Sequence, residues 1–101
     1  MSLGDIGNIM KQAQQLQERL QKEMSAISVE GAAGGGMVTV VVNGHKHVQK
    51  VTIDPEAVSK DDVDMLQDLV AAAINDALRK VDEEMKSKMG GLMTGLGLPG
   101  L

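Results

Sequence analysis

The chain has 101 residues, of which 43% are hydrophobic, and it carries a formal net charge of −4. This length suits one small domain, and the hydrophobic content is typical of a globular protein rather than a disordered one. Because the chain has no cysteine, disulfides, thiolate zinc sites and cysteine catalysis are excluded. Aromatic residues are also absent, so the core must be built from aliphatic side chains and the eight methionines. No secretory signal or membrane-length apolar run is evident, and a cytoplasmic location is therefore expected.

Residues 6–27 are predicted to form a long amphipathic helix, with Asp5 as its N-cap. Apolar residues recur along this segment at spacings of three and four, which makes one continuous stripe. The stripe consists of Ile6, Ile9, Ala13, Leu16, Leu20, Met24 and Ile27. A helix of about 20 residues spans about 30 Å, whereas a compact 100-residue domain has a radius of gyration of about 13 Å. The stripe therefore packs on the core or pairs in part with a second subunit, as in a short coiled coil.

Residues 28–54 are predicted to form the sheet. The segment 28–36 is compatible with a short strand that ends in a glycine-rich bend. A phosphate-binding loop is not favoured there, because no Gly-Lys-Ser/Thr follows and the next element is a strand. The β-branched run 38–42 predicts that strand, and Asn43-Gly44 supplies the positive-φ pair of a tight hairpin turn. The second strand of the hairpin ends before Pro55.

One face of this hairpin is apolar and needs a cover. If the loop has two or four residues, Val38, Val40 and Val42 share that face with Val51 and Ile53. A lone hairpin is only marginally stable in water, so another element must pack on these valines.

Residues 60–89 are predicted to form a second long helix that provides this cover. Ser59 to Asp62 resemble a capping box, and Gly90-Gly91 are expected to end the helix. Its stripe consists of Val63, Leu66, Val70, Ala73, Ala77, Val81 and Met85. The half that begins near Arg79 overshoots the sheet, since a strand of eight residues spans only about 27 Å. Residues 90–101 are expected to form a flexible Gly/Leu-rich tail, whose leucines could dock on a partner.

Nothing in the sequence resembles an active site. His45 and His47 stand on the hairpin tip without the further ligands that a metal site needs, so we interpret them as exposed turn histidines. No serine has a partner base at a motif spacing, and the acidic run of Asp61, Asp62 and Asp64 has a structural explanation at a helix start. We therefore predict no catalytic residues, no metal and no cofactor.

The charges are unevenly distributed along the chain. Residues 1–50 hold five basic and four acidic side chains, whereas residues 51–85 hold three basic and ten acidic ones. On the first helix the basic residues lie opposite the apolar stripe, and two on the second helix do the same. These outward cations either bind DNA phosphates or belong to an ordinary solvated face. The absence of aromatic rings argues against recognition of single strands or RNA by stacking.

Several motifs resemble the bacterial YbaB/EbfC family of nucleoid-associated proteins. They are Ile9-Met10-Lys11-Gln12-Ala13-Gln14, Gly34-Gly35-Gly36-Met37-Val38, Val42-Asn43-Gly44, Ile53-Asp54-Pro55-Glu56, the run from Asp68 to Ala77, and Gly97-Leu98-Pro99-Gly100. The resemblance covers nearly the whole chain in the right order. It implies a small α/β (α+β) homodimer of order α-β-β-β-α, in which a three-stranded antiparallel sheet supports two long helices that project like tweezers.

The resemblance further implies binding of double-stranded DNA in the nucleoid, with weak sequence preference and a change in DNA conformation. Family members contact DNA through the first and last helices. Carried over to this chain, the contact residues are Lys11, Arg19, Lys22, Arg79, Lys80, Lys86 and Lys88. The acidity of residues 54–84 departs from that picture and predicts modest, salt-sensitive affinity. The alternative is a protein–protein interaction module that uses methionine-rich helices and the leucine tail, with DNA binding incidental.

Overall fold

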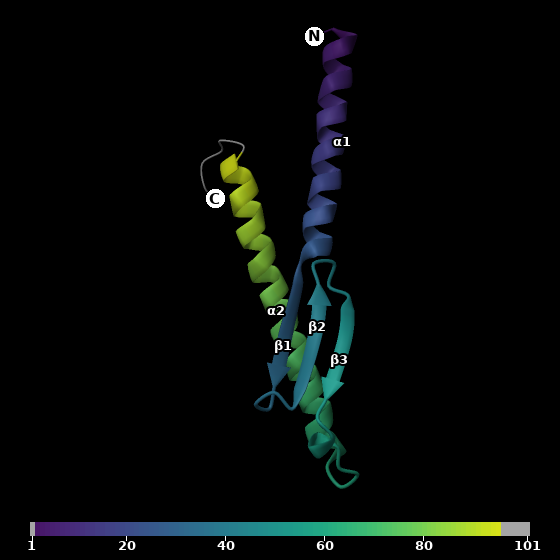
Figure 1. Cartoon of the computed structure of the whole chain (residues 1–101), viewed down its shortest axis with the longest axis vertical. Helices are drawn as coiled ribbons and strands as arrows, with labels where there is room; N and C mark the ends of the chain where they lie inside the picture. The colour runs from purple at the N-terminus through teal and green to yellow at the C-terminus, as the bar shows by residue number, and fades with distance from the viewer. Residues whose placement is uncertain (1, 96–101) are drawn as a thin grey trace.

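The computed structural model describes residues 2–95, in the predicted order α-β-β-β-α (Figure 1). Its elements are α1 (Leu3–Ala26), β1 (Ser28–Ala33), β2 (Val38–Asn43), β3 (Val48–Ile53), a short 3-10 turn (Pro55–Ala57) and α2 (Val63–Gly95). The strands form one antiparallel sheet in the order β1-β2-β3. The α+β fold class and the three-stranded antiparallel sheet are thus confirmed. Residues 96–101, which make up the end of the predicted tail, lie outside the described residues.

The central strand β2 supplies half of the core. Val38, Val40 and Val42 have no exposed surface, as expected for the inward face of a β-branched strand. Val38 pairs with Ile53 and Val40 pairs with Val51, so these valines share one face of the hairpin with β3 as predicted.

Helix α2 covers this face of the sheet, but only over β1 and β2. Ala73, Ala77 and Val81 are fully buried against the valines of β2. The helix approaches β1 so closely at Gly31 that a Cβ there would overlap the backbone of Ala73 and Ala77. The small alanines and this glycine therefore set the distance between helix and sheet. Strand β3 extends beyond the helix, and all six of its residues are exposed.

Both helix starts differ from the prediction by a few residues. Ser2, rather than Asp5, is the N-cap of α1, and Asp5 completes a capping box with it: its amide donates to the Ser2 hydroxyl at 3.3 Å, and its carboxylate accepts from the Ser2 amide at 3.3 Å. At α2, Asp62 accepts a hydrogen bond from the Met65 amide at 3.1 Å, which makes Asp62 the capping residue. The Ser59 hydroxyl instead accepts from the Asp61 amide in the turn before the helix.

The predicted end of the second helix is wrong. Helix α2 continues through Gly90-Gly91 to Gly95. A glycine inside a helix costs about 1 kcal/mol relative to alanine but leaves the backbone hydrogen bond in place, so two glycines weaken a helix without ending it.

The hairpin tip also differs from the predicted Asn43-Gly44 turn. Gly44 is not among the residues with positive φ, whereas Lys46 has a φ of 63°. The Asn43 side chain accepts hydrogen bonds from the amides of His45 and His47 at 2.9 and 3.0 Å, which organises a four-residue loop. Gly44 is required for another reason: a Cβ there would overlap the backbone of Met24 at the end of α1.

The molecule is a long rod rather than a globule. Its principal extents are 71 × 24 × 16 Å, and its radius of gyration is 19.8 Å, compared with about 13 Å for a compact chain of this length. Helix α1 and the last turns of α2 extend past the same end of the sheet and diverge (Figure 1). We call these projecting segments the two arms.

Candidate nucleic-acid interface

Helix α1 is an arm that packs on almost nothing in its own chain. None of its residues from Leu3 to Ala26 is buried, and Ile27, just after its end, is the first buried residue. Leu3, Ile9 and Met10 are each more than half exposed. A helix with an apolar stripe is normally stabilised by packing that stripe. The arm therefore presents both an uncovered apolar face and a polar face to its surroundings.

The cations of α1 are available for an external anion. Within residues 2–95, neither Lys11, Arg19 nor Lys22 forms an ion pair. At 100° per residue, Lys11 and Lys22 lie about 20° apart around the helix and about 16 Å apart along it. Both point away from the side of Leu20, which faces α2. Arg19 instead lines the space between α1 and α2.

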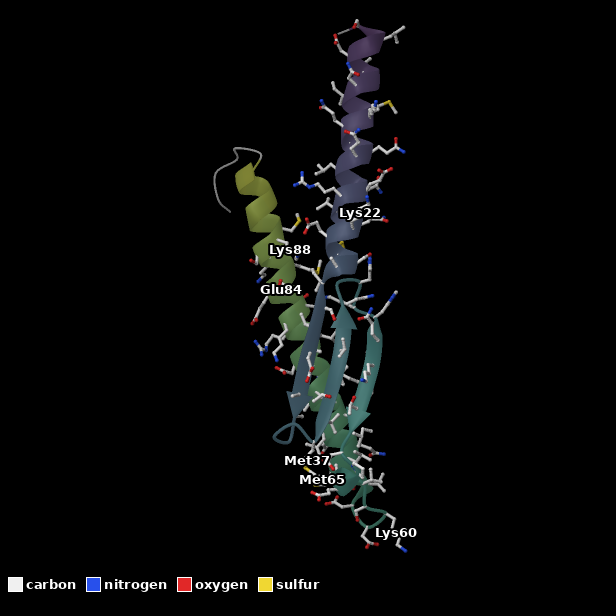
Figure 2. All side chains as sticks on the ribbon, viewed as in Figure 1. Lys22, Met37, Lys60, Met65, Glu84 and Lys88 are labelled. Carbon is white, nitrogen blue, oxygen red and sulfur yellow. The ribbon has the colours of Figure 1, made fainter. Side chains whose placement is uncertain are left out.

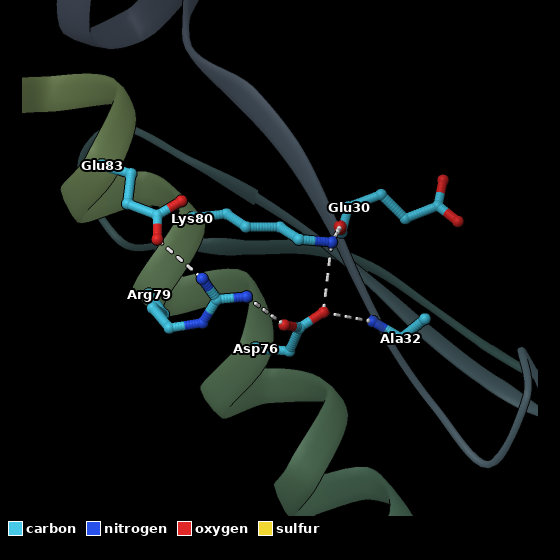
Figure 3. A network of polar contacts seen from close by, with 6 residues as sticks. All are labelled: Glu30, Ala32, Asp76, Arg79, Lys80 and Glu83. Atoms are coloured by element: carbon cyan, nitrogen blue, oxygen red, sulfur yellow. Dashed lines mark hydrogen bonds and ion pairs between the residues drawn. The ribbon is translucent and has the colours of Figure 1, made fainter. Parts of the chain in front are cut away.

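Two of the predicted cations on α2 belong to a network that ties the helix to β1 (Figure 3). Arg79 pairs with Asp76 at 2.9 Å and with Glu83 at 2.6 Å. Lys80 pairs with Asp76 at 3.2 Å and donates to the carbonyl oxygen of Glu30 at 2.9 Å. Asp76 also accepts from the Ala32 amide at 3.0 Å. These side chains fasten the helix to the edge of the sheet, and they are poorly placed to give their charge to DNA.

The electrostatics of Asp76 follow from this network. The hydrogen bond from the Ala32 amide, followed by those from Arg79 and Lys80, lowers the pKa of Asp76 from 3.8 to about 2. The hydrogen bond between Arg79 and Asp76, together with the negative charge of Glu83, raises the pKa of Arg79. The carboxylate of Asp76 is therefore ionised throughout the neutral range and holds both cations in place.

The last two predicted cations lie on the arm of α2. Lys88 reaches across to α1, where its Nζ is 3.3 Å from the Glu23 carboxylate. Lys86 is exposed and has no ion pair within the described part of the chain. It lies two turns beyond Arg79 on the same side of the helix. The structure therefore divides the seven predicted residues into four unpaired cations and three that are already bound.

The hairpin tip adds contacts with both helices that were not predicted from the sequence. His45 Nε2 lies 3.0 Å from the Ser25 hydroxyl of α1, and Lys46 pairs with Asp82 of α2 at 3.1 Å. His45 and His47 are exposed, as predicted, with ring centroids 6.2 Å apart. Among residues 2–95, no three histidine or acidic side chains are grouped as a metal site requires. No helix in that range is long and apolar enough to span a membrane.

The comparisons with known proteins agree in sequence and in fold. A nucleoid-associated protein of Acetivibrio thermocellus is 51% identical over 102 residues, covering 97% of this chain and 90% of the relative. A nucleoid-associated protein of Koribacter versatilis is 49% identical over 96 residues and covers 95% of both chains. The crystal structure of an uncharacterized protein from Helicobacter pylori has the same fold, with a TM-score of 0.73 at 22% identity, over 92% of this chain and 98% of that one. The model of the YbaB/EbfC DNA-binding family matches residues 2–96, and the chain therefore belongs to that family.

Proposed function

We propose that the protein is a homodimer that binds double-stranded DNA through its arms, with low sequence specificity, and alters DNA conformation in the nucleoid. The observation that carries this proposal is helix α1, a projecting arm with unpaired cations and no buried residue. Membership of a DNA-binding family and the names of the nucleoid-associated relatives support the same function.

A second copy of the chain is proposed because too much apolar surface is left uncovered in one copy. The stripe of α1 is exposed at Ile6, Ile9 and Leu16. A second apolar surface lies on β3, where Val51 and Ile53 belong to the core-facing side of the sheet but extend past α2 and remain 44% and 36% exposed. Large apolar patches of this kind usually mark an interface. A single copy of the arm would also be a long helix without tertiary support.

The cations proposed to bind DNA phosphates are Lys11, Arg19, Lys22 and Lys86. They are unpaired within residues 2–95, and contacts of lysine or arginine with phosphate do not depend on base sequence. A dimer presents each of them twice. We expect a smaller contribution to DNA binding from Arg79, Lys80 and Lys88, because a phosphate would have to displace the carboxylates that already bind them.

The experiment is a titration of a duplex with the purified chain at several salt concentrations, together with sedimentation to measure the mass. We expect binding at 50 mM salt that weakens steeply by 200 mM, with a slope that grows by about 0.9 for each phosphate contact. We expect similar affinity for unrelated duplex sequences. Binding that is insensitive to salt, or restricted to one sequence, would contradict this mode of recognition.

A second candidate function is that of a protein–protein interaction module whose apolar arms bind other proteins. The exposed stripe of α1 is the observation that favours it. If sedimentation gives a dimer but the duplex titration shows no binding at low salt, this second function replaces the first.

A further inference from the structure

The two arms face each other across an open groove that is apolar at its base and carries charged side chains from both helices. Leu20 of α1 and Met85 of α2 belong to the apolar part. Among the described residues, the charged side chains that line the groove are two cations, Arg19 and Lys88, and one carboxylate, Glu23. Apolar walls concentrate the field of the charges that line a cleft. The groove therefore presents one cation from each arm, with a single acidic group beside them.

Of the predicted cations that are already bound, Lys88 is held by the fewest partners. Within residues 2–95 its Nζ pairs with Glu23 at 3.3 Å and with no other acidic side chain. Arg79, in contrast, pairs with two carboxylates. Lys80 pairs with Asp76 and also donates to a backbone carbonyl oxygen. Removal of one carboxylate is thus enough to release Lys88, whereas the other two would each keep a partner.

We propose that Glu23 limits the affinity of the arms for DNA by occupying Lys88. This inference rests on the proposed DNA binding and adds to it a phosphate site between the arms, formed by Arg19 and Lys88. The side chains of Lys88 and Glu23 are 38% and 47% exposed, so a phosphate can reach the lysine Nζ. A carboxylate and a phosphate compete for the same ammonium group. Glu23 is therefore an inhibitor of DNA binding that is built into the arm itself.

The exposure of this ion pair sets the size of the expected effect. Because an exposed pair is weak, release of Lys88 should tighten duplex binding by up to about fivefold per chain rather than by orders of magnitude. A released Lys88 that contacts one phosphate should also steepen the salt slope by about 0.9 per chain. The slope separates a new phosphate contact from a general loss of negative charge, which raises affinity without adding a contact.

The test compares the full chain with its Glu23→Gln and Glu18→Gln variants by duplex titration at several salt concentrations. Glu18 is the matched control, because it is exposed on the same arm and forms no ion pair within the described residues. Glutamine and glutamate have similar helix propensities, and circular dichroism checks that both variants keep the helix. We expect Glu23→Gln to bind up to about fivefold more tightly per chain than Glu18→Gln, with the steeper slope.

The same pair of substitutions is then made in a Lys88→Gln background. There we expect Glu23→Gln and Glu18→Gln to have equal effects, because no lysine is left for Glu23 to release. A specific gain for Glu23→Gln that persists without Lys88 would overturn the proposal. Equal gains for the two variants in the unmodified background, or tighter binding without a steeper slope, would overturn it as well.

Failure of the proposed function has a different signature. If neither the unmodified chain nor Glu23→Gln binds a duplex at 50 mM salt, the proposed DNA binding is wrong and the role of Glu23 is wrong with it. If the unmodified chain binds but Glu23→Gln has no specific effect, only the role of Glu23 is wrong. Binding by Glu23→Gln alone would support both.

Discussion

The amide of Gly44 donates a hydrogen bond of 3.1 Å to the carbonyl oxygen of Met24, and this bond joins the hairpin tip to the last turn of α1. The Ser25 hydroxyl and His45 Nε2, 3.0 Å apart, lie beside it. Since α1 buries none of its own residues, the direction of the arm depends largely on this junction.

Gly44→Ala should destabilise the protein. The new Cβ would overlap the backbone of Met24, and overpacking of this kind typically costs about 1–3 kcal/mol. Chemical denaturation should show a lower free energy of unfolding. Gly7→Ala is the matched control: its Cβ would have no neighbour within 4 Å and it lies in a helix, where alanine is favoured by about 1 kcal/mol. Equal effects of the two substitutions would contradict the role of the junction.

Asp76→Asn should remove a stabilising contribution that depends on pH. The pKa of Asp76 is lowered from 3.8 to about 2, so the stabilisation from its ionised form is complete above pH 4 and is lost as the pH falls through about 2. The groups that face it are the Ala32 amide, Arg79 and Lys80. Urea unfolding of both proteins should therefore give a difference in free energy that is largest above pH 4 and shrinks towards pH 2. A difference that is constant across this range would exclude the ionised carboxylate as its source.

The pair of substitutions Lys11→Gln and Lys22→Gln should weaken duplex binding equally for all sequences, and each phosphate contact that is lost should lower the salt slope by about 0.9. Lys60→Glu changes the net charge by the same amount at the far end of the molecule and is the control (Figure 2). Arg79→Gln should affect binding less than the double variant, because Arg79 is already paired with Asp76 and Glu83. Gel shifts and fluorescence titrations at low salt measure the duplex affinity of all three variants. A larger loss of affinity for Lys60→Glu would show that DNA binds to a different surface.

Val51→Lys should weaken the proposed dimer. Val51 lies on the core-facing side of β3 but outside the cover of α2, so a lysine there places a charge in the proposed contact without entering the core of one copy. Thr52→Lys, on the opposite face of the same strand, should leave the mass unchanged. Sedimentation equilibrium measures both variants. Dimers of equal strength would show that the second copy binds elsewhere, for instance along the stripe of α1.

The types and order of the helices and strands could be predicted because local residue patterns determine most of them. The β-branched run of β2 and the three-and-four spacing in both helices predict element types that the structure confirms. Element ends were less predictable, since they depend on competing caps. Ser2 and Asp5 are both good capping residues, as are Ser59 and Asp62. Only the hydrogen bonds from backbone amides to these side chains show which residue of each pair caps the helix.

The candidate interface was less predictable than the fold, because the availability of a cation depends on residues that are distant in sequence. Lys80 lies 50 positions from Glu30, and Lys88 lies 65 positions from Glu23, yet each pair is in contact. Helical periodicity places Arg79 and Lys86 on one face but does not show that only Arg79 is neutralised by its neighbours. The junction at Gly44 had a sequence signal, but we attributed this glycine to turn geometry rather than to contact with a helix.

The hydrogen bonds of Asp76 and Lys80 to β1 have a consequence for how copies of this sheet can associate. Strand β1 forms one edge of the sheet, and two polar groups on that edge, the Ala32 amide and the Glu30 carbonyl, are already hydrogen-bonded within the chain. A strand from another molecule could not hydrogen-bond to these two groups without displacing Asp76 and Lys80, so the edge formed by β3 is the more available one. Growth by strand addition needs two receptive edges on every molecule. The contacts of Asp76 and Lys80 with β1 therefore disfavour growth into a fibre by repeated strand addition.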